Sequence, residues 1–221
     1  MGVFLGDTLP VAIVADGMGG HSAGEIASRF AVEAVGECPV TDAEHIPACL
    51  RRALEKANER VFAKAAESPE YQGMGTTAVM ACFTDDRVHI AHIGDSRAYI
   101  WQDGKLTQLT QDHSLMSEWL HTGIITPQEA AVHPYRHVIT RAIGTHDRVS
   151  ADLCAADFPR GARLLLCSDG LTNEVNDYIL ARWMKCQDLQ QAAQGMMDAA
   201  LAAGGHDNIT LILTEREGDD A

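Results

Sequence analysis

The sequence of 221 residues lacks the features that mark membrane proteins and nucleic-acid-binding proteins. No apolar run reaches the length of a membrane-spanning helix, and the amino terminus shows no basic stretch followed by an apolar one. Positive charge is scarce, with 17 Lys and Arg against 31 Asp and Glu and a formal net charge of −14. We therefore expect neither membrane insertion nor nucleic acid as a partner.

Cysteine pairs and linkers are also missing. The six cysteines are scattered and form no Cys-x-x-Cys pair, so we expect reduced thiols in a cytoplasmic protein rather than a zinc site or a disulfide framework. No Pro-, Gly- or Ser-rich tract and no block of like charge separates the two halves. We therefore expect residues 1–221 to form a single domain, and a hydrophobic content of 46% is enough for its core.

The apolar residues that are present follow two periods. Spacing typical of amphipathic helices occurs in four stretches: 24–36, 42–67, 177–185 and 189–203. Short β-branched or aromatic runs predict strands at 11–15, 76–83, 88–93, 97–101, 106–109, 151–155, 163–167 and 209–213. The runs between 76 and 109 predict an antiparallel meander, with a hairpin turn at Asp103-Gly104.

Residues 112–150 are the least regular part of the chain. The pattern predicts a helix near 114–123 and a second helix start at Thr126-Pro127. His133 and His137 have helical spacing, but Pro134 lies between them and no Glu follows His133, which disfavours a zinc-binding helix. We interpret the histidines of this segment as surface or packing residues.

The strand at 11–15 ends in Asp16, and the next residues, Gly17-Met-Gly-Gly-His21, allow the backbone to fold close to whatever Asp16 holds. Three further aspartates stand beside predicted strands: Asp95 after 88–93, Asp169 after 163–167 and Asp207 before 209–213. If the last strand runs antiparallel to the other three, all four carboxylates meet at one edge of the β layer.

Four neighbouring carboxylates repel one another, and some must take up protons unless cations lie between them. Oxygen ligands favour magnesium or manganese over zinc, and the carbonyl of Gly17 offers one more oxygen. Two such ions can bind and deprotonate a bridging water and neutralise an anionic substrate. The sequence therefore predicts a metal site for two Mn²⁺ or Mg²⁺ ions.

At this point the motifs resemble those of a known family, the bacterial metal-dependent serine/threonine protein phosphatases of type 2C (PPM). The resemblance runs in the family's order from about residue 9 to the end. Its motifs are Val14-Ala-Asp-Gly-Met-Gly-Gly-His21, Gly24-Glu-Ile-Ala-Ser28, Gly73-Met-Gly-Thr-Thr77, Ile93-Gly-Asp-Ser-Arg97, Thr110-Gln-Asp-His-Ser114, Thr140-Arg-Ala-Ile-Gly144, Cys167-Ser-Asp-Gly-Leu171 and Asp207-Asn-Ile-Thr210.

The resemblance implies an α+β fold, a four-layer α/β/β/α sandwich of two central antiparallel sheets flanked by helices. It implies that Asp16 bridges two metal ions, that Gly17 gives its carbonyl to one of them, and that Asp169 and Asp207 complete the other. Asp95 would help to hold a weaker third ion. Residues of about 112–145 would form a mobile flap beside the site.

The resemblance also implies a reaction and partners. Our hypothesis is in-line attack of a metal-bridging hydroxide on the phosphorus of phosphoserine or phosphothreonine, with His21 protonating the departing alkoxide. The substrates would be phosphorylated proteins, and a bacterial serine/threonine kinase would be the opposing partner.

The sequence departs from the family pattern at its start. Relatives begin with a strand pair that carries a phosphate-binding Arg, followed by an Asn-Glu/Gln-Asp triplet, and residues 1–10 contain neither. Neither Arg97 nor Arg141 matches that Arg by motif. The missing charge predicts weaker substrate binding, and missing edge strands predict an exposed sheet edge that could pair with another chain.

Two alternatives to an active phosphatase are also consistent with parts of the sequence. A phosphatase-like domain that binds partners without turnover would be consistent with the missing Arg. A serine hydrolase could use Ser96, Asp169 and His206, since Gly94-Asp-Ser96 half resembles a nucleophile elbow. That elbow requires a helix after the serine, whereas the sequence predicts a strand there.

Overall fold

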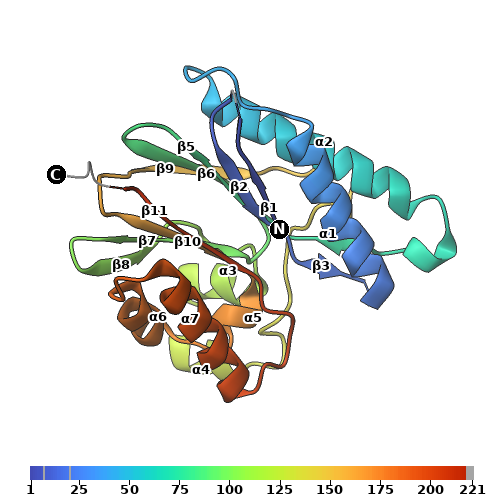
Figure 1. Ribbon diagram of the computed structural model, residues 1–221. Helices are drawn as coiled ribbons and strands as arrows, with labels where there is room; N and C mark the ends of the chain where they lie inside the picture. The colour runs from blue at the N-terminus through green and yellow to red at the C-terminus, as the bar shows by residue number, and fades with distance from the viewer. Residues whose placement is uncertain (7, 20, 218–221) are drawn as a thin grey trace.

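Two antiparallel sheets lie face to face between two layers of helices (Figure 1). The computed structural model describes residues 1–6, 8–19 and 21–217, apart from the side chain of His21. The first sheet has the order β1-β2-β5-β6-β9: Gly2–Phe4, Val11–Val14, Ala78–Phe83, Arg87–Ile93 and Asp152–Asp157. The second has the order β11-β10-β7-β8: Leu211–Glu215, Arg163–Cys167, Arg97–Gln102 and Lys105–Gln108. The predicted α+β sandwich is confirmed.

Each sheet carries its own helical layer. Helices α1 (His21–Gly36) and α2 (Ile46–Ala65) cover the five-stranded sheet, and α6 (Asp177–Met184) and α7 (Leu189–Ala203) cover the four-stranded one (Figure 1). The shorter elements are β3 (Gly17–Met18), β4 (Gly75–Thr76), η1 (Pro69–Tyr71), α3 (Leu115–His121), α4 (Pro127–Val132) and α5 (Asp169–Thr172). None of the described helices combines the length and hydrophobicity that a membrane crossing requires.

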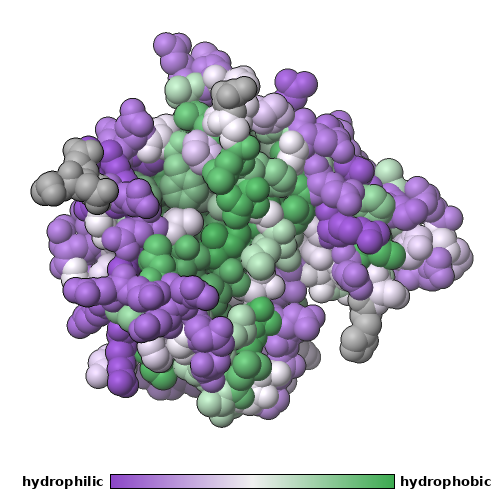
Figure 2. All heavy atoms as spheres, viewed as in Figure 1, coloured by the Kyte–Doolittle hydropathy of each residue, from purple (hydrophilic) through white to green (hydrophobic). Residues whose placement is uncertain are grey.

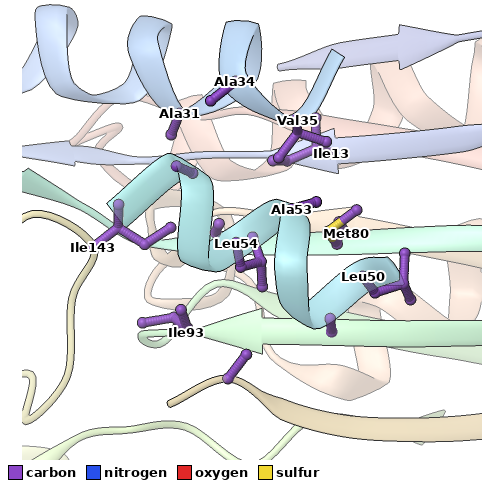
Figure 3. Close-up of a cluster of buried hydrophobic side chains, with 14 of the residues drawn as sticks. Ile13, Ala31, Ala34, Val35, Leu50, Ala53, Leu54, Met80, Ile93 and Ile143 are labelled. Atoms are coloured by element: carbon purple, nitrogen blue, oxygen red, sulfur yellow. The ribbon is translucent and has the colours of Figure 1, made fainter. Parts of the chain in front are cut away.

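The core has three parts, because both faces of each sheet are covered. Along β2, Val11 and Ile13 point toward α1 and α2, while Ala12 and Val14 point toward the second sheet. All four are buried, as expected for a strand enclosed on both sides. Figure 3 shows Ile13 among side chains of the helical layer such as Val35 and Leu54. Burial on both faces explains why this run is uniformly apolar.

The predicted meander is wrong at its centre. Strands β5 and β6 pair with each other, and so do β7 and β8, but β6 and β7 belong to different sheets. The chain crosses between the sheets at Gly94-Asp95-Ser96, where Gly94 has a φ of +100°. The hairpin turn is confirmed: Asp103 and Gly104 both have positive φ, 51° and 77°, as a type I′ turn requires.

The exposed sheet edge differs from the expected one. Residues Gly2–Phe4 pair antiparallel with β2, so β1 rather than β2 forms the edge of the five-stranded sheet. Val3 on this edge is 55% exposed. Figure 2 shows apolar side chains in a band across the face on which β1 and β11 lie.

Candidate active site

Four aspartates converge at one end of the sandwich, and they come from both sheets. Asp16 follows β2, and Asp95 lies in the crossover between β6 and β7. Asp169 begins α5 directly after β10, and Asp207 lies in the loop between α7 and β11. Strands β10 and β11 are antiparallel, which is the arrangement assumed from the sequence. The structure therefore brings all four predicted carboxylates together.

Burial and the charges of the neighbouring carboxylates raise the pKa values of two of the four aspartates. The pKa of Asp16 is raised to about 8, first by burial and then by the neighbouring carboxylates of Asp169, Asp207 and Asp95, with Asp169 also sharing a hydrogen bond with Asp16. Burial raises the pKa of Asp95 to about 7, with added repulsion from Asp169 and Asp112. A proton or a metal ion must relieve this repulsion at neutral pH.

Hydroxyl groups hold the Asp16 backbone in place. The carbonyl oxygen of Asp16 accepts hydrogen bonds from the Thr77 amide and the Thr76 hydroxyl, both at 2.8 Å. The Asp16 amide donates to Oγ1 of Thr77 at 3.2 Å, and that atom lies 2.6 Å from Oγ of Ser96. Because Ser96 follows Asp95, this buried contact between Thr77 and Ser96 ties the Asp16 loop to the Asp95 loop across the two sheets.

Glycines allow the backbone segments around the carboxylates to touch. A Cβ on Gly17 would lie 1.9 Å from the carbonyl oxygen of Gly24, and a Cβ on Gly24 would lie 2.7 Å from that of Gly17. A Cβ on Gly170 would lie 2.3 Å from the carbonyl oxygen of Asn208. The Gly17 loop is thus seated on the start of α1, and the Asp169 and Asp207 loops are in contact.

A pocket of about 1090 Å³ opens beside the carboxylates. One wall includes Asp95, Asp169 and Asp207, and a second wall comes from α3, α4 and the residues after α4. The second wall is partly apolar, with Met116 and Leu120 among its residues. The pocket can therefore admit an anionic group at the carboxylate edge only if bound cations screen it, while the other wall contacts apolar groups.

Arginines near the site differ in their freedom to bind an anion. The guanidinium of Arg97 donates to both carboxylate oxygens of Asp112, at 2.9 and 2.6 Å, and to the Tyr99 hydroxyl. Arg141 donates to Asp152 at 2.7 Å. Arg136 lines the pocket and is exposed, and within the described chain its guanidinium makes no hydrogen bond or ion pair. Arg136 is thus available to bind an anion, and no motif in the sequence predicted this.

The donor set fits hard divalent cations by its chemistry. All predicted ligands supply oxygen, and the main charges that Asp16 experiences are those of three other aspartates. Among the described residues, however, no three His, Cys, Asp or Glu side chains already form a coordination cage. The fit rests on the uncompensated carboxylates and on the close backbone approach at Gly17.

Two sequence predictions have different outcomes here. His21 begins α1, but its side chain lies outside the described residues, so its role as proton donor stays a prediction. The serine hydrolase alternative lacks its geometry: Ser96 is 1% exposed and contacts Thr77, while His206 contacts Glu174 at 2.8 Å. Ser96 is also followed by β7 instead of a helix.

Comparison with known proteins agrees with the motifs. Residues 3–203 match the family described as Protein phosphatase 2C. The chain is 40% identical over 217 residues to the serine/threonine phosphatase stp of Listeria monocytogenes, covering 96% of this chain and 86% of that protein.

Solved structures are similar over nearly the whole chain. The serine/threonine phosphatase Stp1 of Staphylococcus aureus superposes with a TM-score of 0.92 at 38% identity, covering 98% of this chain and 88% of that one. The catalytic domain of the phosphatase PstP in complex with two manganese ions superposes with a TM-score of 0.86 at 34% identity, covering 97% and 90%. The sequence match, the shared fold and the gathered aspartates together show that this chain belongs to the protein phosphatase 2C family.

Proposed function

We propose that this serine/threonine phosphatase hydrolyses phosphoserine and phosphothreonine esters at the edge formed by Asp16, Asp95, Asp169 and Asp207, loaded with two or three Mn²⁺ or Mg²⁺ ions. The observation that carries the proposal is the repulsion among these carboxylates, which together with burial raises the pKa of Asp16 to about 8. When bound, the ions would activate water and neutralise the phosphoryl oxygens. The PstP complex with two manganese ions supports the choice of metal.

Each ligand has a distinct place in this proposal. Asp16, at the centre of the mutual repulsion, would contact both principal ions. The carbonyl of Gly17 would serve one ion, and Asp169 and Asp207 would serve the other. Asp95, in the crossover loop, would hold the weaker third ion. Asn173 donates to Oδ2 of Asp169 at 2.9 Å, which orients that carboxylate.

The reaction is an in-line displacement at phosphorus. A bond forms between phosphorus and the oxygen of the attacking water, and the bond to the serine or threonine oxygen breaks. The departing alkoxide takes up a proton, for which His21 is the proposed donor. Arg136, whose guanidinium has no partner among the described residues, would contact the phosphoryl group or an acidic part of the substrate.

The proposal also covers the substrates, the opposing enzyme, the flap and the cellular compartment. The substrates would be phosphorylated proteins, with a bacterial serine/threonine kinase as the opposing enzyme, and residues of about 112–145 would act as a flap over the pocket within a single domain. The cytoplasm is the proposed compartment, which the six free thiols support.

The variant Asp207→Ala tests the proposal. Asp207 is exposed, so the variant should fold, while its turnover of a phosphothreonine peptide with Mn²⁺ should fall by about 100-fold or more. Asp198→Ala, an exposed aspartate of α7 away from the pocket, is the matched control. Near-normal turnover by Asp207→Ala would contradict the ligand assignment. A parent protein that binds the peptide without hydrolysing it would contradict the enzymatic function.

A further inference from the structure

His113 joins the Asp95 loop to the base of the 112–145 segment. The backbone amide of His113 donates to the carbonyl oxygen of Gly94 at 3.0 Å. In return, the Gly94 amide donates to Nδ1 of the His113 ring at 3.1 Å. Gly94 directly precedes Asp95, so this pair of bonds fixes the backbone that carries the Asp95 carboxylate.

The hydrogen bond from Gly94 sets the tautomer of the ring. Because an amide donates to Nδ1, that nitrogen carries a lone pair and the proton lies on Nε2. Nε2 lies 3.2 Å from Oδ2 of Asp152, though not aligned for a regular hydrogen bond, and Asp152 also accepts from Arg141. The ring is 4% exposed and stacks on His92 with centroids 4.7 Å apart. Burial lowers the pKa of His113, which keeps the imidazole neutral and Nδ1 free to accept.

The same residue closes the base of the segment that forms the pocket wall. The carbonyl oxygen of His113 accepts from the Thr140 amide at 2.8 Å, and the Leu115 amide donates to Val138 at 2.9 Å. The two ends of the segment are thus paired with each other. His113 therefore links the base of the pocket wall to the Asp95 loop.

We propose that His113 is a positioning residue whose neutral Nδ1 couples ion binding at Asp95 to the order of residues 113–140. The inference rests on the proposed function, because it takes Asp95 as an ion ligand. An ion that fixes the Asp95 loop also fixes Gly94, and Gly94 holds His113. By reciprocity, an ordered segment increases the affinity of the Asp95 edge for the ion.

Substitutions of His113 that do or do not keep an acceptor at the position of Nδ1 distinguish this role from simple packing. His113→Asn places its amide oxygen close to the position of Nδ1 and keeps an acceptor for Gly94. His113→Gln places its amide group near the position of Nε2 and loses that acceptor. His113→Ala removes the ring entirely. Asp152→Asn is the matched control, because it removes the charge beside Nε2 and leaves the bonds to Gly94 intact.

Hydrogen exchange of backbone amides, with and without Mn²⁺, is the measurement, and Mn²⁺ binding is followed separately by calorimetry. In the parent, Mn²⁺ should slow exchange at Gly94 and over 113–140. In His113→Ala and His113→Gln this protection should be lost and Mn²⁺ should bind about tenfold more weakly. His113→Asn and Asp152→Asn should behave like the parent. If His113→Ala does not fold, the comparison of Asn with Gln still decides.

The outcomes separate the two levels of the argument. A parent that shows no calorimetric Mn²⁺ binding overturns the proposed function itself. A parent that binds Mn²⁺ but gains no protection over 113–140, or Gln and Asn variants that behave alike, overturns only the role of His113.

Discussion

The metal-free protein should become more stable when Asp16 loses its charge. Burial and the neighbouring carboxylates raise the pKa of Asp16 from 3.8 to about 8, so the folded state holds a proton that the unfolded state has released. Between pH 4 and pH 8 the folded state therefore binds more protons, and its stability falls as the pH rises. Asp16→Asn removes this titration and can still donate a hydrogen bond to Asp169.

The size of the effect follows from the pKa shift. At 1.36 kcal/mol per pKa unit, over the roughly three units between the unfolded pKa and pH 7, the upper limit is about 4 kcal/mol. Because the carboxylates share protons and water screens the site in part, we expect a gain on the order of 2 kcal/mol at pH 7. The gain in stability should be absent below pH 4, increase between pH 4 and pH 8, and stay constant above pH 8.

Urea unfolding in EDTA at several pH values measures this difference directly. Asp198→Asn, an exposed aspartate on α7, is the matched control and should be neutral. In Mn²⁺ the parent should instead be the more stable of the two proteins. An ion at 100 times its dissociation constant stabilises the parent by about 2.7 kcal/mol, and Asp16→Asn binds the ion poorly. An Asp16→Asn variant no more stable than the parent in EDTA at pH 7, or a difference independent of pH, would refute the reasoning.

Two further substitutions test the surroundings of the carboxylates. Arg136→Ala should raise KM for a phosphopeptide about tenfold and leave the stability unchanged, with the exposed Arg148→Ala as control; an unaltered KM would show that Arg136 does not contact substrate. Thr77→Val should lower the free energy of unfolding by about 1–3 kcal/mol, because the Asp16 amide and the Ser96 hydroxyl lose a buried partner. Thr77→Ser should restore the stability, and a Thr77→Val variant as stable as the parent would count against the hydroxyl link.

Local patterns in the sequence predicted the long helices, most of the strands and the four carboxylates, but not strand β1. The run Val11–Val14 is apolar because both faces are buried, and the turn Asp103-Gly104 is encoded by residues that tolerate positive φ. Asp16, Asp95, Asp169 and Asp207 could be identified because each stands beside a predicted strand, and strand ends in one layer meet at few edges.

The tertiary structure alone decided which strands pair and which polar groups are free. Nothing in the residues 76–109 distinguishes a continuous meander from one that changes sheets at Gly94-Asp95-Ser96, because strand period is the same in both. Arg97 and Arg136 look equivalent as sequence letters. In the structure, however, Arg97 is paired with Asp112, whereas Arg136 lines the pocket and has no partner among the described residues. Likewise, Thr77 and His113 act through partners 19 residues away, Ser96 and Gly94, and a local period carries no information about such contacts.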